Sequence, residues 1–274
     1  QLEREDTNYE LKNFEMPVNQ QNGIHTRLAD LPNSVPLDSV KHYEDYIARL
    51  HQIPRVLDQV TEVLKQGEKD GLMPPKLVLT KLPGQCDGVV AANPFVLPTK
   101  KFPKDFTEAE RKRLTDEITK AANEAVAPAY KKFADFLRTE YAPKGREDIS
   151  VESLPDGQRR YAEAVKMMTT TNFTPAEVHE IGVKEVARIT DEMTKLAKAQ
   201  GYKDLAAFRT AINNDPKWKP KSEQQIVDDF AKYIHQMEPK LPELFNLLPE
   251  SPVTVEALPD FAKAASTHSV PGTP

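Results

Sequence analysis

The distribution of proline and glycine is the feature of this sequence that most restricts its fold. The 274 residues contain 23 prolines but only 10 glycines, and the prolines cluster between periodic segments rather than inside them. Proline interrupts helices, and the stretches it leaves free carry apolar residues every three or four positions. The pattern predicts an all-α fold, a multi-helix array of long antiparallel helices with proline-rich loops and at most a short strand near the C-terminus.

Composition excludes several classes of protein. No run approaches the roughly 18 consecutive apolar residues of a membrane helix, so we expect no transmembrane segment. The 37 basic and 42 acidic residues are mixed along the chain, which carries a net charge of -5, so no nucleic-acid partner is expected. Cys86 is the only cysteine, which excludes an internal disulfide and a cysteine-based zinc site.

Three regions are expected along the chain. Residues 1–37 lack a sustained period and predict an extended or irregular entry segment. Residues 38–250 carry the periodic stretches and predict a helical domain. Residues 251–274 begin with the alternating, β-branched PVTVEAL, which predicts a short strand, and continue as an irregular tail with no closing element.

Two helices of the predicted domain have strong start signals. Thr107 with Glu110, and Thr174 with Glu177, have capping-box spacing, because the threonine hydroxyl can accept from the backbone N–H three residues later while the glutamate reaches back. The second helix is expected to close at Gly201, since glycine readily adopts the left-handed conformation that terminates helices.

Other segments are predicted from interruptions and from apolar spacing. Pro128 is expected to kink or restart the helix that begins at Thr107. Residues 83–106 contain four prolines and no clear period, and predict the longest irregular loop. A helix of about ten residues before the polar run TTTN is expected to bury Tyr161, Val165 and Met168.

The stretch TPAEVHEIGVKEVARI, residues 174–189, places a histidine beside a glutamate, as helical zinc sites do. Such a site needs a second ligand three or four residues away on the same face, but the residues at those distances from His179 are glycine and valine. We therefore expect His179 to be a partly buried histidine hydrogen-bonded to a neighbouring segment, and Glu185 to pair with Arg188.

No complete active site is recognisable elsewhere. The remaining five histidines are dispersed and form no ligand pair of familiar spacing; they are His25, His42, His51, His235 and His268. His268 lies in the irregular STHSVPGTP and is either an ordinary loop histidine or a cleft-lining residue. Nucleophile elbows and glycine-rich phosphate loops are missing. The sequence predicts no catalytic, cofactor-binding or metal-ligating residue in this chain.

Four stretches resemble the bacterial family known as domain of unknown function 885 (DUF885), which is grouped with zinc metallopeptidases. They are SVKHYEDYIARL, EKDGLMPPKLVL, VAPAYKKFADFLRTEY and LPDGQRRYAEAVKMMTTTNFTPAEVHEIGVKEVARITDEM, and they run through most of residues 10–250. The last is the most specific, because a polar threonine run precedes a capped helix with His179 and Glu185. The resemblance implies a helical bacterial protein of the periplasm or cell envelope, commonly a lipoprotein.

The zinc signature of that family, H-E-x-x-P-G-H-H, is absent from these 274 residues. In the family it would supply two histidine ligands and a glutamate general base on a later helix. The resemblance thus implies a chain truncated before its catalytic region, inactive and without a cofactor by itself, with zinc held in the full-length protein.

The implied role is that of a helical, non-catalytic portion of a zinc-dependent, peptidase-like hydrolase. It would form one wall of the cleft for a peptide-like substrate and have the remainder of its own polypeptide as partner, with His179 and Glu185 fixing a helix contact. The alternative is a non-enzymatic helical interaction module of an envelope protein.

Overall fold

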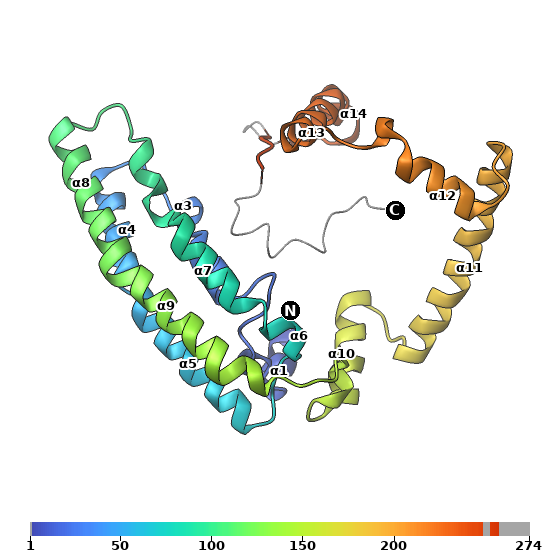
Figure 1. Cartoon of the computed structure of the whole chain (residues 1–274), viewed down its shortest axis with the longest axis horizontal. Helices are drawn as coiled ribbons and strands as arrows, with labels where there is room; N and C mark the ends of the chain where they lie inside the picture. The colour runs from blue at the N-terminus through green and yellow to red at the C-terminus, as the bar shows by residue number, and fades with distance from the viewer. Residues whose placement is uncertain (1, 249–252, 258–274) are drawn as a thin grey trace. The chain divides into compact units, whose positions relative to one another are not determined.

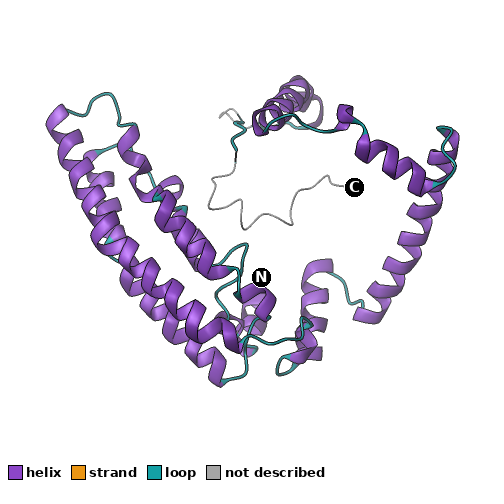
Figure 2. Cartoon of the chain, in the orientation of Figure 1, coloured by secondary structure: helices purple, strands orange, loops and turns teal. Residues whose placement is uncertain are grey.

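The computed structural model describes residues 2–248 and 253–257, and within these ranges the chain is all-α (Figures 1 and 2). Apart from helices and loops, the described residues contain a single parallel β-bridge, between Pro75 and Arg146. The predicted fold class is confirmed. Residues 253–257 of the predicted strand have no regular structure, and the two ends of that stretch lie outside the described residues.

The described residues divide into two compact units at Asn172, so the predicted helical domain of residues 38–250 is split. Unit 1 contains α1 (Leu2–Glu10), α2 (Ile24–Ala29), α3 (Leu31–Ser34), α4 (Val40–Leu50), α5 (Ile53–Lys69), α6 (Lys76–Leu79), α7 (Leu82–Ala92), α8 (Glu108–Ala121), α9 (Ala127–Phe136) and α10 (Gly157–Thr169). Unit 2 contains α11 (Pro175–Ala199), α12 (Leu205–Asn214), α13 (Glu223–Met237) and α14 (Leu241–Leu244).

The hydrophobic core lies in unit 1, where α7 packs on α9, α5 on α9 and α4 on α8 (Figure 1). Its largest fully buried side chains are Tyr43, Tyr46, Tyr130, Tyr141, Phe133, Leu50, Ile53, Leu57, Leu64, Leu72, Leu79 and Leu82. Buried tyrosines need partners for their hydroxyls, and the Tyr46 hydroxyl donates to the Phe95 carbonyl at 2.8 Å. These contacts join the helices to the loop that follows α7.

The predicted entry segment, residues 1–37, contains α1, α2 and α3 instead of extended chain. The helices α2 and α3 are six and four residues long, too short to show a helical period in the sequence. Helices of this length are unstable alone in water and form because they pack on other elements. Ala29 and Pro32 are buried accordingly.

The predicted irregular loop of residues 83–106 begins with a helix. Pro83 lies in the first turn of α7. Backbone N–H groups there have no acceptor within the helix, so the absence of an N–H in proline costs no hydrogen bond. The helix LPGQCDGVVAA is apolar on most sides and largely buried, so it lacks the polar face that would have revealed its period. Asn93, in the left-handed conformation with φ 44°, ends it, and a 3-10 helix, Pro94–Lys100, follows.

Pro128 does not interrupt its helix, because a π-helical turn precedes it. Residues Ala122–Val126 are π-helical, and the Ala127 N–H donates to the Ala122 carbonyl five residues back. Proline in a regular helix collides with the carbonyl four residues earlier, and the wider π turn relieves that collision. A second π turn, Leu137–Tyr141, stands in the same relation to Pro143.

Arg160 attaches α10 to the start of the chain. Its guanidinium is buried and donates to the Pro155 carbonyl, the Asn13 side chain and the Leu11 carbonyl, each at 2.6 Å. Of the side chains predicted to be buried on this helix, Val165 is buried, whereas Tyr161 and Met168 are exposed in the described part of the chain. The hydrogen bonds of Arg160 therefore hold this helix in place, where a buried apolar face was expected.

Unit 2 confirms the predicted caps but has almost no core. Thr174 and Glu177 form the capping box of α11, and Gly201 follows this helix with φ 82°. Ala197 is the single buried hydrophobic residue among those described between 173 and 257. The other apolar side chains of α11 longer than alanine are exposed or half-buried.

Candidate functional site

The structure places two of the three candidate residues from the sequence, His179 and Glu185, on the exposed surface of α11 and outside the lining of the pocket described below. His179 is exposed on α11, so the expected partial burial against a neighbouring segment is not seen among the described residues. Glu185 pairs with Arg188 as predicted, and the hydrogen bonds from this arginine hold the pKa of the Glu185 carboxyl below its ordinary value. His268 lies outside the described residues. A cleft-lining role for these residues stays a prediction.

The described residues do not fit a zinc site. A zinc ion needs three or four nitrogen, oxygen or sulfur ligands converging at one point. No group of three or more His, Cys, Asp and Glu side chains in residues 2–248 and 253–257 could hold a metal ion. Cys86 is buried in the core, and burial raises the pKa of its thiol to about 12, so it is not a reactive thiolate.

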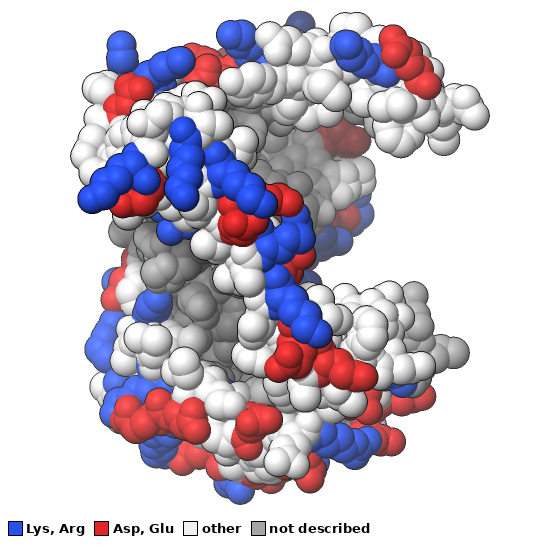
Figure 3. Space-filling model, turned by 90° about the vertical axis from the view of Figure 1, so that its right-hand side faces the viewer, with Lys and Arg blue, Asp and Glu red and all other residues white. Residues whose placement is uncertain are grey.

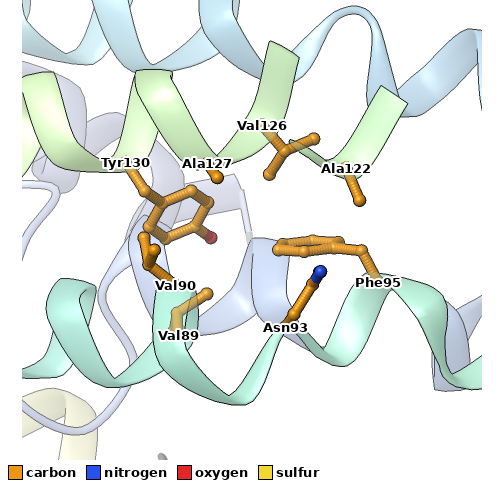
Figure 4. A pocket seen from close by; sticks show the side chains of 8 residues that line it. All are labelled: Val89, Val90, Asn93, Phe95, Ala122, Val126, Ala127 and Tyr130. Atoms are coloured by element: carbon orange, nitrogen blue, oxygen red, sulfur yellow. The ribbon is translucent and has the colours of Figure 1, made fainter. Parts of the chain in front are cut away.

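A small pocket lies between the end of α7 and the first π turn (Figure 4). Its empty volume is ≈ 170 Å³, and its lining residues are Val89, Val90, Asn93, Phe95, Ala122, Val126, Ala127 and Tyr130. This volume includes open solvent, so the space that the side chains enclose is far smaller than the roughly 300–1,000 Å³ of a small-molecule pocket. The lining is mainly apolar, and the Tyr130 hydroxyl already donates to the His25 carbonyl at 2.7 Å. This pocket is a packing gap beside the π turn and not a substrate site.

Beside this pocket, His25 forms the most buried polar group of unit 1. It is 0% exposed, and its Nε2 lies 2.9 Å from Gln85 Oε1. The Gln85 amide nitrogen donates to the Gln20 carbonyl at 2.8 Å, which makes Oε1 the acceptor and assigns the histidine proton to Nε2. His25 Nδ1 then has a lone pair with no partner among the described residues. The imidazole joins α2 to α7.

Acidification should destabilise unit 1 through His25. Burial lowers the pKa of this imidazole below its ordinary value, and protonation would place an unpartnered N–H in the core. Below about pH 6.5 the unfolded chain binds a proton that the folded chain does not, so stability falls as the pH drops toward the folded pKa. We expect the urea midpoint to be lower at pH 5.5 than at pH 7.5.

The variant His25→Gln provides the comparison for this pH effect. It should be less stable than the wild type at pH 7.5 but lose less stability between the two pH values. His51→Gln is the control, because His51 is exposed, and it should keep the pH dependence of the wild type. Equal pH dependence in the wild type and His25→Gln would contradict the assignment.

A second buried polar group, Glu15, lies where the segment after α1 meets α5. It is 5% exposed, and burial, followed by the negative charge of Asp70, raises the pKa of its carboxyl. Lys12 pairs with Asp70 and lies 3.9 Å from Glu15. The backbone fits closely at this point, because a Cβ on Gly67 would lie 2.6 Å from the Glu15 carbonyl oxygen. The cluster holds the entry segment in place.

These buried polar groups could not be found from the sequence. His25 and Gln85 are 60 residues apart, and Glu15 and Asp70 are 55 apart, without a shared motif. The sequence contains one indirect signal, Gly67 in the last turn of α5, which indicates a close backbone approach without naming the approaching segment. Only the packing of α2 and α7, and of the entry segment on α5, brings the partners together.

The face shown in Figure 3 has no charged patch of one sign. On the face shown in Figure 3, lysine and arginine side chains lie interspersed with aspartate and glutamate. None of the helices in the described part of the chain combines the length and the apolar character needed to cross a membrane. The chain is therefore an all-α multi-helix protein, and its described residues form no cluster of metal ligands.

The chain belongs to the family described as "Bacterial protein of unknown function (DUF885)", which it matches over residues 1–273. "The crystal structure of the putative lipoprotein from Colwellia psychrerythraea" shares the fold, with a TM-score of 0.77 and 24% sequence identity. The match covers 89% of this chain and 44% of that protein, so this chain spans less than half the length of its structural relative. None of the curated proteins compared with the chain matches it.

Proposed function

We propose that this chain is the helical, non-catalytic portion of a bacterial zinc-dependent, peptidase-like hydrolase and forms one wall of its substrate cleft. The proposal is carried by the match of residues 1–273 to the family, together with a structural relative of this chain that is more than twice as long as the matched region. The zinc chemistry rests on the resemblance of the four sequence stretches, since the described residues offer no ligand set of their own.

The division of the chain supports a wall rather than a complete enzyme. Unit 1 buries its own core, whereas the described residues of unit 2 bury one hydrophobic residue. Helices gain most of their stability from burying an apolar face. Unit 2 therefore has apolar surface available for the remainder of a longer polypeptide, which is the partner we assign to it.

A location in the bacterial periplasm or cell envelope belongs to the same proposal. It is supported by the resemblance and by the description of the Colwellia psychrerythraea relative as a lipoprotein. A fusion of the complete reading frame to a reporter enzyme that is active only after export should give signal in the host bacterium. A fusion protein that accumulates at full length without reporter activity would contradict this location.

Metal content and hydrolysis test the proposed chemistry. The dialysed 274-residue chain should contain far less than one zinc per chain and should not hydrolyse a peptide library. The protein from the complete reading frame should contain stoichiometric zinc and hydrolyse peptides until a chelator removes the metal. Replacing the signature glutamate by glutamine should abolish hydrolysis while zinc remains bound, because that residue is the expected general base.

Two outcomes of these measurements would contradict the proposal. One is stoichiometric zinc or hydrolysis in the 274-residue chain alone. The other is a complete protein that contains no zinc and cleaves no peptide, which would favour the non-enzymatic interaction module. The surface of interspersed charges and the proline-rich loops are equally suitable for that alternative.

A further inference from the structure

An apolar stripe along α11 is largely exposed among the described residues. Its members recur at helical spacing and are Val178, Ile181, Val186, Ile189, Met193 and Leu196. Ile181 is 50% exposed, Val186 65% and Leu196 62%. An amphipathic helix in a folded protein turns such a stripe toward another element, so this face has the composition of a packing surface.

Gly182 interrupts the stripe at a position that unit 2 does not explain. It lies four residues from both Val178 and Val186, in one row along the helix, and a Cβ placed on it would meet nothing within 4 Å. Glycine destabilises the interior of a helix relative to alanine, because it leaves the unfolded chain more freedom. The described contacts of α11 give no compensation for this cost.

Another helical glycine of this chain, in the last turn of α5, shows what such a residue can permit. Gly67 lies inside α5, and a Cβ there would come within 2.6 Å of the Glu15 carbonyl oxygen, so the crossing segment requires glycine. Gly84 also faces open space, but it lies in the first turn of α7, where backbone N–H groups are still unpaired. Gly182 lies farther from a helix end than Gly67 does, and no crossing segment approaches it among the described residues.

We propose that a helix from the polypeptide that accompanies this region in longer proteins of this fold crosses α11 at Gly182. Glycine in a ridge of apolar side chains leaves a notch into which a large apolar side chain of a crossing helix fits. Glu185, one turn farther along α11 and paired with Arg188, lies within the stripe, four residues from both Ile181 and Ile189. This also gives the helix contact predicted for Glu185 a location.

The length of the structural relative identifies the occupant. More than half of the Colwellia psychrerythraea protein lies outside the match to this chain, which is enough polypeptide to supply helices against unit 2. Unit 1 fills its core from its own residues. The inference uses exposure, helical spacing and chain length, and does not depend on zinc or on hydrolysis.

Substitutions at Gly182 in two lengths of chain test the proposal. In the 274-residue chain, Gly182→Ala and Gly182→Leu should keep or raise the helix content, because both residues favour helix over glycine. In the protein from the complete reading frame, Gly182→Leu should fill the notch and lower Tm by several degrees. The same variant should increase hydrogen exchange along α11.

Ala187→Leu is the matched control, because Ala187 is a small exposed residue on the other side of the same helix. It should leave Tm and exchange unchanged in both chains. Four outcomes would overturn the proposal. The reading frame could encode no further polypeptide, or Gly182→Leu and Ala187→Leu could behave equally in the longer protein.

The other two outcomes concern the 274-residue chain. A dimer that Gly182→Leu dissociates would assign the stripe to a second copy of the chain. Protection of α11 that Gly182→Leu removes would assign the stripe to unit 1.

Discussion

Replacing Leu64 by alanine will lower the free energy of unfolding of the 274-residue chain by roughly 2–5 kcal/mol, the usual cost of truncating a core leucine. Leu64 is completely buried in α5 and belongs to the core of unit 1. The truncation removes buried apolar surface and leaves a cavity that the surrounding helices fill only in part. Urea unfolding followed by far-UV circular dichroism measures the change.

Leu196→Ala is the control with the same chemical change at an exposed site. Leu196 is 62% exposed on α11, so its loss should change the free energy of unfolding by no more than about 0.5 kcal/mol. In the longer protein proposed above, the same substitution should become costly, because a partner would cover it. Equal losses for both variants in the 274-residue chain would show that α11 already packs on a core.

Hydrogen exchange should divide the 274-residue chain near residue 172. Amides of α5 and α9, at the centre of the unit 1 core, should be protected by about 10³-fold or more, since they exchange only when the core unfolds. Amides of α12 and α13 should show little protection, because helices of 10 and 15 residues are marginal in water without tertiary packing. The capping box and the 25-residue length of α11 should give it intermediate protection.

Exchange measured by mass spectrometry on peptic fragments resolves these segments. In the longer protein, protection of α11 should rise, because the proposed crossing helix would shield its stripe. Uniform protection across unit 1 and unit 2 in the 274-residue chain would contradict the division into a unit with a core and a unit without one. The exchange of α5 serves as the internal reference, since its packing is complete in unit 1.

Local signals in the sequence were reliable where a few neighbouring residues decide the structure. The capping boxes at Thr107 and Thr174 and the left-handed Gly201 were confirmed, because each depends on hydrogen bonds or backbone angles within about four residues. The helix α7 was missed, since its buried surface on most sides removes the alternation of polar and apolar residues that reveals a helix.

For the candidate functional residues, local sequence predicted less and tertiary packing decided more. The pairing of Glu185 with Arg188 was predictable from a spacing of three residues on one helix. The burial of His25, in contrast, results from segments far apart in the sequence, so no local pattern distinguished it from the other histidines. His179 was expected to be partly buried, but its exposure depends on whether another element packs on α11, which the local sequence does not encode.

By itself, the sequence determined the helical class of this protein, its main helix boundaries and its resemblance to a bacterial family, because proline placement, caps and apolar period are local properties of the chain. Tertiary structure decided which helices have a core. It placed His25 and Glu15 in the interior of unit 1 and left the stripe of α11 exposed. The physical reason is that burial depends on contacts between distant segments, and within the described residues a Cβ at Gly182 would meet nothing while Ile181, Val186 and Leu196 stay exposed.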